Sequence, residues 1–465
     1  MDRRTFLNTG ALSLAAARLG VGVPASPPLP GGSAAATDSP LARPSAAQLA
    51  WQRDELAMFL HFGVNTFTDQ EWGDGKEDPA IFNPTRFDAR QWARAARAAG
   101  LRALILTAKH HDGFCLWPTA TTKHSVAASP FRGGQGDVVR EFVDACAAEG
   151  LRAGLYLSPW DRNHPTYGDS PAYNDVYATQ LTELLTRYGT VSEVWFDGAN
   201  GEGPSGRRQS YDWPRVWGIV RRLQPGAVIF SDAGPDVRWC GNERGVAGDP
   251  NWSAVDPTVV RFPGQSDDTV GPALQHGDPL GSVWRPAEVD VSIRPGWFYH
   301  PAQDGAVRSE DNLVELYFTS VGRNAKLLLN VPPTRDGLLH ETDVARLLGL
   351  HRRLEGMRSS SVPLTRSSWR RTGERTAAGE WSLGSSSAPS VVRLAEPIAR
   401  GQRISRYTLE GRGGQGWQRL GVGTTIGHCR LQRIESVAPI RQLRLRVEDS
   451  VAPPEPVDVE LFSAV

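Results

Sequence analysis

The sequence is poor in cysteine, and its four cysteines are too scattered to suggest a disulfide framework or a metal site. No two of them stand at the short spacing that cysteine metal sites use. We therefore expect reduced, partly buried thiols. The cysteines are Cys115, Cys146, Cys240 and Cys429.

An excess of charge of either sign is also missing. Lys plus Arg and Asp plus Glu both number 51, so the formal net charge is zero. A chain without a strong overall field does not attract nucleic acid or an anionic membrane surface. This balance predicts a neutral substrate and no nucleic-acid partner.

The N-terminal region lacks an apolar run long enough to cross a membrane. Its one apolar stretch is short and interrupted by glycine. This stretch follows Arg3 and Arg4 and precedes Pro- and Ala-rich sequence with small residues suited to cleavage. The order is typical of a twin-arginine export leader. We expect residues 1–45 to be leader and linker, the protein to be periplasmic or extracellular, and no membrane insertion after leader removal.

The remaining sequence is long enough for a large core and a second domain, with 40% hydrophobic residues. From about residue 46 to 358, strand-like apolar runs alternate with helical segments, which predicts an α/β fold with a (β/α)8-like (TIM) barrel. Gly100 and Gly150 each end a helix before a buried strand. A Pro-, Gly- and Asp-rich insertion interrupts the pattern at 245–285. The predicted strands are 57–62, 103–108, 153–158, 192–196, 227–231, 288–293 and 325–330.

The C-terminal part has a different pattern. A polar stretch at 358–361 reads as a linker, and short alternating runs at 390–394, 404–409 and 440–447 are separated by Gly, Ser and Pro. This pattern predicts a C-terminal β-sandwich over residues 359–465. We expect it to be a packing partner of the barrel rather than an independent sugar-binding module.

Two carboxylates stand where a barrel enzyme would carry its catalytic groups. Asp197 and Gly198 follow the apolar run 194–196, at the C-terminal end of a predicted strand. Glu243 follows one β/α unit later, in a Trp- and Gly-rich loop, and so from a neighbouring strand end. A lone Asp-Gly often only caps a turn or helix. Paired carboxylates at strand ends instead suggest glycoside hydrolysis.

The other predicted strand ends carry polar and aromatic groups. His61, His110 and His111 lie at the ends of the first two strands, and Tyr156 lies in the third. Zinc is the alternative for such histidines, but sequence neighbours rarely bind one metal from a strand, and no carboxylate ligand set accompanies them. Donors to sugar hydroxyls explain the set better. We expect no metal and no organic cofactor.

At these residues the sequence resembles the α-L-fucosidases of glycoside hydrolase family 29. The resemblance implies a retaining mechanism with Asp197 as nucleophile. It also implies an apolar wall from Phe59 and Trp195 for the fucose methyl group. The fucose-binding set that it implies is His61, Glu71, Trp72, His110, His111 and Tyr156. The matching motifs, in order over about 50–360, are His61-Phe62-Gly63, Glu71-Trp72, Lys109 to Phe114, Trp195 to Gly198, and Leu329 to Pro333.

The segments 236–243 and 287–300 resemble the subgroup that acts on α-1,3- and α-1,4-linked fucose of Lewis-type glycans. In that subgroup the residue matching Glu243 is the acid/base. Glu288 is the second candidate for this role, and an ion pair with Arg285 or Arg294 is its alternative explanation. Trp297, together with Trp239, would border the second sugar.

The resemblance therefore implies an exo-acting, retaining α-L-fucosidase that hydrolyses terminal α-1,3- or α-1,4-linked fucose from oligosaccharides or glycoconjugates. Two alternatives stay open. One is a broad or α-1,2-preferring α-L-fucosidase, because contacts outside the fucose subsite fix the linkage. The other is a catalytically silent fucose-binding protein, which the presence of both Asp197 and Glu243 disfavours.

Overall fold

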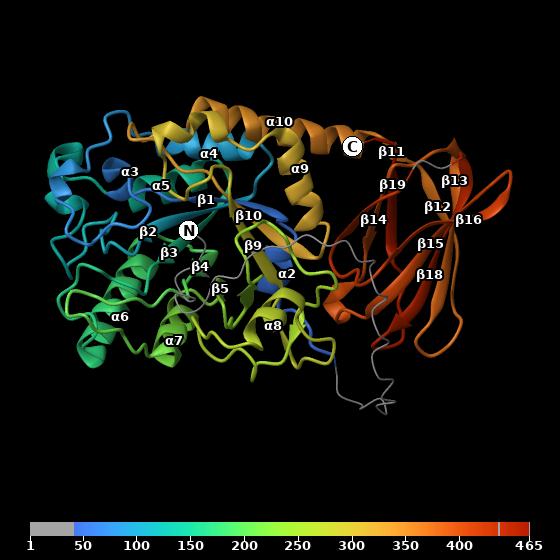
Figure 1. The fold of residues 1–465 in the computed structure, drawn as a ribbon, viewed down its shortest axis with the longest axis horizontal. Helices are drawn as coiled ribbons and strands as arrows, with labels where there is room; N and C mark the ends of the chain where they lie inside the picture. Colours follow the sequence, from blue (N-terminus) through green and yellow to red (C-terminus); the bar gives the residue numbers. More distant parts are fainter. Residues whose placement is uncertain (1–40, 436–437, 465) are drawn as a thin grey trace, which may run out of the picture.

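A computed structural model describes residues 41–435 and 438–464, so residues 1–40 of the predicted leader lie outside it. Figure 1 shows two domains side by side: a barrel of strands and helices, and a sandwich of β-sheets formed by the C-terminal part of the chain. Ala42 packs against Ala254, Trp284 and Ile398, so the chain already lies on the folded body at that point. In the described part of the chain, no helix is both long and apolar enough to cross a membrane.

The barrel is a closed sheet of eight parallel strands, which confirms the predicted fold class. Its order around the barrel is β1-β10-β9-β6-β5-β4-β3-β2. The strand that the sequence analysis missed is β6, because it has only three residues and follows β5 without an intervening helix. The strands are β1 (Leu56–Leu60), β2 (Ala103–Lys109), β3 (Arg152–Leu157), β4 (Glu193–Trp195), β5 (Val228–Ser231), β6 (Val237–Trp239), β9 (Ala287–Ser292) and β10 (Ala325–Asn330).

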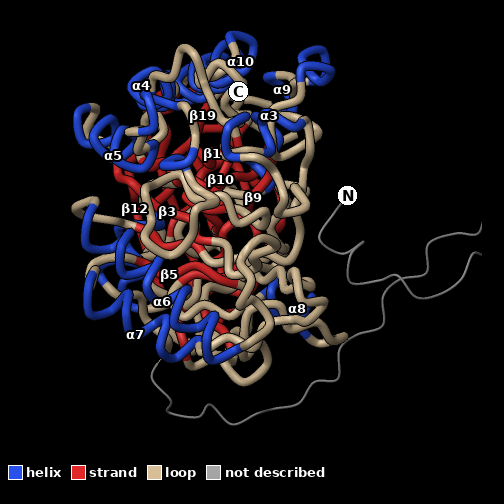
Figure 2. The backbone as a smooth tube through the Cα atoms, turned by 90° about the vertical axis from the view of Figure 1, so that its left-hand side faces the viewer, coloured by secondary structure: helices blue, strands red, loops and turns tan. Residues whose placement is uncertain are grey.

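Helices lie around the outside of the barrel strands, as Figure 2 shows. Asp88 and Asp137 cap two of them by accepting hydrogen bonds from backbone N–H groups of the first turn. Gly100 and Gly150 follow these helices with φ of +78° and +68°, the left-handed conformation that ends a helix without strain at glycine. The main helices are α4 (Ala89–Ala98), α5 (Val138–Ala148), α6 (Ser170–Arg187), α7 (Trp213–Leu223), α9 (Glu310–Thr319) and α10 (Glu341–Ser359).

Shorter elements fill the loops. The irregular segment 245–285 contains a two-stranded antiparallel sheet and one helix, which agrees with the predicted insertion. The short elements are α2 (Ala46–Gln52), α3 (Asn65–Thr68), α8 (Val270–His276), β7 (Ala254–Val255), β8 (Val283–Trp284), η1 (Pro79–Ile81), η2 (Val126–Ala128), η3 (Phe131–Gly134), η4 (Pro301–Ala306) and η5 (Ile398–Arg400).

The second domain consists of two antiparallel sheets packed around their own apolar core, as predicted. The predicted linker is not one, because α10 continues to Ser359 and the first strand begins at Ser361. One sheet has the order β11 (Ser361–Val362), β19 (Asp458–Phe462), β14 (Val391–Ala395), β17 (Arg430–Arg433). The other has the order β12 (Leu364–Arg371), β13 (Ala377–Ser387), β18 (Ile440–Ser450), β15 (Ile404–Gly413), β16 (Gly416–Gly423).

The two domains share part of their packing. Leu431 and Phe462 of the sandwich are buried in the same apolar cluster that lies between the barrel strands and their helices. Arg430 donates two hydrogen bonds of 2.9 Å to the carboxylate of Asp249 in the barrel insertion. Such a bidentate pair fixes orientation as well as distance. The sandwich is therefore held against the barrel by both apolar and charged contacts.

Side chains alternate between the outside and the inside of the barrel, as strand geometry requires. Met58 and Val194 pack toward the helices, whereas Phe59, Trp195 and Phe230 pack with one another in the interior. The interior layer near the amino-terminal ends of the strands, called here the charged layer, consists of Lys326, Glu193 and Glu288. Lys326 lies 3.0 Å from Glu193 and 3.7 Å from Glu288, and all three side chains are buried.

Two indoles tie this charged layer to the apolar interior. The Nε1 of Trp51 on α2 donates to Glu193 at 2.8 Å, and the Nε1 of Trp195 donates to Glu288 at 2.9 Å. Burial, followed by the charge of Glu193, raises the pKa of Glu288 well above its ordinary value. Lys326 opposes this shift and is the cation that holds the two carboxylates together.

We expect Lys326→Ala to lower the free energy of unfolding by about 3–5 kcal/mol, because it leaves Glu193 buried without its cation. Lys123→Ala is the matched control, since this lysine is exposed, and it should change stability by no more than about 0.5 kcal/mol. Denaturant unfolding of the purified proteins measures both values. A loss below about 1 kcal/mol for Lys326→Ala would show that the layer contributes little to stability.

Candidate active site

Strand alternation directs a second set of polar side chains to the carboxyl end of the barrel, called here the barrel mouth. Inward positions recur every second residue, so Asp197 stands two residues beyond Trp195, and Asn330 two residues beyond Leu328. His61 follows Phe59 in the same way. All parallel strands end at this mouth, which is where barrel enzymes carry their catalytic groups.

Asp197 is 4% exposed and surrounded by hydrogen-bond donors. The hydroxyl of Tyr156 donates to its Oδ2 at 3.3 Å, and the backbone N–H of Ala199 donates to its Oδ1 at 2.8 Å. The Nε2 of His111 lies 4.0 Å from Oδ2. These donors favour the negative charge on the buried carboxylate.

The three predicted histidines come together at the mouth. The His61 and His110 rings are 5.4 Å apart between centroids, and the His110 and His111 rings are 4.1 Å apart. His61 Nδ1 is 2.8 Å from Oδ1 of Asn330, and His111 Nδ1 is 2.8 Å from Oγ of Ser158. A hydrogen bond at one ring nitrogen fixes the orientation of the whole imidazole.

Aromatic side chains form the apolar wall of this cluster. The Phe59 ring lies 4.5 Å from His61, 5.1 Å from Trp195 and 5.9 Å from Tyr156. Trp195 in turn stacks on Phe230 with ring planes only 9° apart. The predicted wall of Phe59 and Trp195 therefore lies directly beside the predicted polar residues.

Three further tryptophans surround the mouth. Trp72 lies 6.2 Å from His111 and 6.1 Å from Trp160, and Trp297 lies 5.1 Å from His61. Trp160 was not among the predicted site residues, although its ring is 5.0 Å from His111. Trp72 and Trp297 are only half-buried, so each has an indole surface open to solvent.

Glu71 lies in the same region but contacts another loop. Its carboxylate accepts hydrogen bonds from the backbone N–H groups of Trp297 at 2.8 Å and Phe298 at 3.2 Å. It also lies 2.5 Å from Nε2 of His300. Glu71 thus joins the loop after α3 to the loop after β9.

Glu243 lies in the loop after β6 and is half-buried. Asp197 follows β4, so the two residues do not come from neighbouring strands as predicted. In the barrel, β5 lies between β4 and β6, so Asp197 and Glu243 follow strands that are not adjacent. Asp232, directly after β5, is buried and accepts a 3.0 Å hydrogen bond from the N–H of Gly264.

Glu288 is not at the mouth. It is the second residue of β9, so it lies in the charged layer at the opposite end of the barrel interior. Its predicted ion pair with Arg285 or Arg294 is wrong, since its cation is Lys326. Arg294 instead contacts Asp343 and Asp304, each at 2.8 Å.

Sequence reasoning missed several residues of this region for different reasons. Asp232 carries the same strand-end signal as Asp197, and Asn330 stands in the motif Leu329 to Pro333, which by itself indicates no role for this residue. His300 has no local signal, because its contacts depend on how two loops fold against each other.

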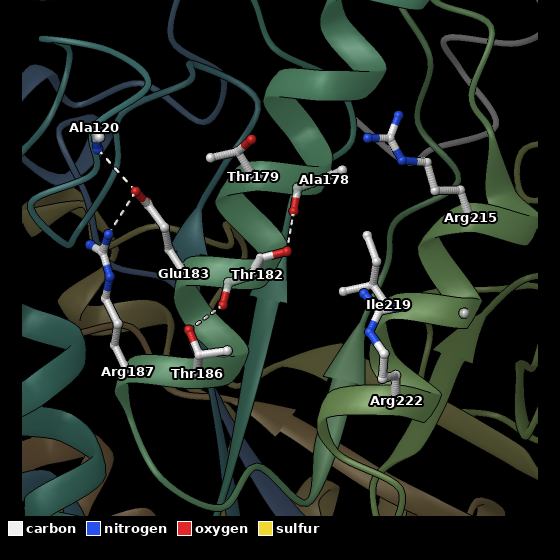
Figure 3. A pocket seen from close by; sticks show the side chains of 11 residues that line it. Ala120, Ala178, Thr179, Thr182, Glu183, Thr186, Arg187, Arg215, Ile219 and Arg222 are labelled. Atoms are coloured by element: carbon white, nitrogen blue, oxygen red, sulfur yellow. Dashed lines mark hydrogen bonds and ion pairs between the residues drawn. The ribbon is translucent and has the colours of Figure 1, made fainter.

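Two cavities lie away from Asp197, and the described residues do not meet the requirements of a metal site. In the described ranges 41–435 and 438–464, no three His, Cys, Asp or Glu side chains gather in a way that could hold a metal ion. A cavity of about 740 Å³ lies between α6 and α7 on the outer face of the barrel and includes none of the predicted site residues (Figure 3). A cavity of about 180 Å³ lies under the insertion and is lined in part by Asp232, Arg238, Val260 and Leu274.

Comparison with known proteins points to one family. The family model described as α-L-fucosidase matches residues 35–355. α-L-Fucosidase 1 of Arabidopsis thaliana is 43% identical over 441 residues, which cover 88% of this chain and 85% of the plant protein.

Solved structures agree with this match. A glycoside hydrolase 29 family member from an unknown rumen bacterium is 38% identical with a TM-score of 0.83, covering 92% of this chain and 78% of that one. A GH29 fucosidase of Ruminococcus gnavus in complex with fucose is 30% identical with a TM-score of 0.80, covering 93% of this chain and 96% of that one.

Proposed function

Because this chain belongs to the α-L-fucosidase family of glycoside hydrolases, we propose that it removes terminal α-1,3- or α-1,4-linked fucose from Lewis-type oligosaccharides or glycoconjugates. Members of glycoside hydrolase family 29 retain the anomeric configuration, which requires two displacements at the same carbon. The observation that supports hydrolysis is the buried Asp197 at the end of β4, among donors and aromatic groups, whereas the linkage rests on the resemblance of segments 236–243 and 287–300 to the α-1,3/4 subgroup.

Asp197 is the nucleophile in this proposal. A nucleophilic carboxylate must be ionised and fixed in direction, and the Tyr156 hydroxyl and the Ala199 N–H hold its two oxygens in place. Attack of an Asp197 oxygen on the anomeric carbon forms a glycosyl-enzyme ester and breaks the bond to the leaving sugar.

The fucose subsite needs one apolar corner for the methyl group and polar partners for three hydroxyls. Phe59 and Trp195 supply the apolar corner, which lies against His61 and Tyr156. His61, His110, His111, Glu71 and Trp72 supply the remaining surface of the subsite. The close contacts among these rings support their assignment to one subsite.

Glu243 is the proposed acid/base. It first gives a proton to the oxygen of the leaving sugar and then takes a proton from the water that attacks the glycosyl-enzyme. Its position after β6, on the same mouth as Asp197, supports this role. Glu288 is excluded from it by its position, because the side chain is fully buried among Lys326, Glu193 and Trp195 below the mouth.

Trp297 and Trp239 are proposed to border the subsite for the second sugar. Trp297 lies above His61 and is half-buried, so part of its ring can stack on a sugar face. The Nε1 of Trp239 donates to Asp290 at 2.7 Å, which fixes the indole at the end of β6. A broad or α-1,2-preferring specificity is the alternative that the linkage experiment below distinguishes.

Export by the twin-arginine route is a further part of the proposal. It rests on Arg3 and Arg4 and the apolar run after them, which lie outside the described residues. The substrate would then be a periplasmic or extracellular glycan.

We expect Asp197→Ala to fold normally and to lose turnover of an aryl fucoside by about a thousandfold or more. Added azide should restore product formation as a fucosyl azide of inverted configuration, because a small anion can occupy the space of the lost carboxylate. Product configuration is measured by NMR. Wild-type turnover in this variant would contradict the assignment. Turnover of the aryl fucoside by the unmodified protein would by itself contradict the alternative of a silent fucose-binding protein, since such a protein does not hydrolyse its ligand.

The acid/base role is tested by leaving-group dependence. Glu243→Gln should slow cleavage of oligosaccharides by about a hundredfold or more while affecting activated aryl fucosides far less, because only the former need protonation. Glu288→Gln is the matched control, since the amide can still accept from Trp195 and should show no such dependence. A leaving-group effect in Glu288→Gln instead would exchange the two assignments.

The linkage proposal predicts that a branched α-1,3/4-fucosylated trisaccharide is cleaved at least about tenfold more efficiently than a linear α-1,2-fucosyl disaccharide. Trp297→Ala should reduce this ratio of kcat/KM values and spare small aryl fucosides. Product analysis on paired substrates measures the ratio. Equal rates in the unmodified enzyme would contradict the linkage assignment and leave the family assignment intact.

A further inference from the structure

The loop that carries Trp297 is fixed at two places. At its base, the Ser292 hydroxyl donates to the Gly296 carbonyl at 2.7 Å, and Asn330 donates to the Trp297 carbonyl at 2.8 Å. At its tip, the Glu71 carboxylate accepts from the N–H groups of Trp297 and Phe298. The backbone of Trp297 is therefore held jointly by Asn330 and Glu71, and displacement of Glu71 would leave it held on one side only.

Glu71 is held by His300, which lies between two carboxylates. His300 Nδ1 is 2.8 Å from Oδ1 of Asp69, and His300 Nε2 is 2.5 Å from Oε1 of Glu71. An ionised carboxylate can only accept hydrogen bonds and a neutral imidazole has only one N–H, so both of these hydrogen bonds form together when the ring is protonated. Arg335 adds positive charge, with its guanidinium 3.8 Å from the Asp69 carboxylate.

We propose that Asp69, His300 and Glu71 form a charge clamp that positions Trp297 and so determines how well the enzyme binds the second sugar of its substrate. The inference rests on the proposed role of Trp297 in that subsite. His300 and Asp69 are positioning residues here, since they act on the substrate only through Glu71 and the backbone of the loop.

The backbone around the clamp is shaped for this contact. A Cβ atom at Gly296 would overlap the Glu71 carboxylate and would also lie 3.0 Å from Cδ2 of His300. Asp69 ends α3 in the left-handed conformation, with φ of +60°, which turns the chain after the helix. Both features bring the loop after α3 into close contact with the loop after β9.

The clamp depends on the protonation of His300. Partial burial lowers the pKa of His300, but hydrogen bonds to Asp69 and Glu71 and the charges of both carboxylates outweigh it and raise the pKa above the ordinary value. A group whose pKa is raised by folding stabilises the structure below its ordinary pKa and loses that contribution as pH rises through the raised value. The clamp should therefore loosen on the alkaline side of the ordinary histidine range.

The experiment compares the unmodified enzyme with His300→Gln and Asp69→Asn by hydrogen exchange and by kinetics across pH. We expect His300→Gln to speed exchange of the Trp297 and Phe298 amides by about tenfold or more, because Glu71 loses the partner that holds it. We expect KM for the branched trisaccharide to rise several-fold more than KM for an aryl fucoside, because Glu71 also belongs to the proposed fucose subsite and only the branched substrate has the additional contact with Trp297. His351→Gln, on α10 and away from this loop, is the matched control.

Asp69→Asn keeps an oxygen that accepts from His300 but removes one negative charge. The alkaline loss of branched-substrate binding should therefore move to lower pH, which a purely structural role of Asp69 would not cause. Unchanged exchange in His300→Gln, equal losses on both substrates, or an unmoved pH profile in Asp69→Asn would each overturn the clamp. Failure of the linkage proposal is distinguishable, because it appears as equal rates on branched and linear substrates in the unmodified enzyme.

Discussion

Closure of eight parallel strands into one barrel is the constraint on which the rest of this structure depends. Closure removes the sheet edges, the parallel order of the strands brings all their carboxyl ends to the same mouth, and strand alternation decides which side chains point inward. Inward-pointing residues that stand two positions after an apolar interior residue therefore meet at that mouth. Asp197, His61 and Asn330 all reach the site by this rule, although long stretches of chain separate them.

The barrel interior links the charged layer to the mouth through packed aromatic rings. Lys326 holds Glu193 and Glu288, Glu288 accepts from the indole of Trp195, and Trp195 packs against Phe59 and Tyr156. Tyr156 in turn donates to Asp197. Asp197 is thus supported, on the side of the barrel interior, by packed and hydrogen-bonded side chains, which is the kind of preorganisation that electrostatic catalysis requires.

The loops supply what the strands cannot. Strand ends place Asp197, His61 and Asn330 at the mouth, whereas Glu71, Trp297 and His300 come from two loops that are held together by charge and backbone hydrogen bonds. Contacts made by loops can change without disturbing the strands that carry the remaining residues of the site. The sandwich domain contributes through packing, since its apolar residues and Arg430 hold the barrel insertion and helices in place.

The sequence by itself determined the fold class, seven of the barrel strands and the gathering of Asp197 with the histidines, because apolar period and strand-end position are local signals. It did not reveal β6, which follows β5 without an intervening helix and so does not form a separate β/α unit, and it therefore placed Asp197 and Glu243 on neighbouring strands. Only the tertiary structure decided that Glu288 lies below the mouth with Lys326, and that His300 meets Glu71. Such charge partners come from segments far apart in the chain, and their pairing is fixed by how barrel and loops close in space.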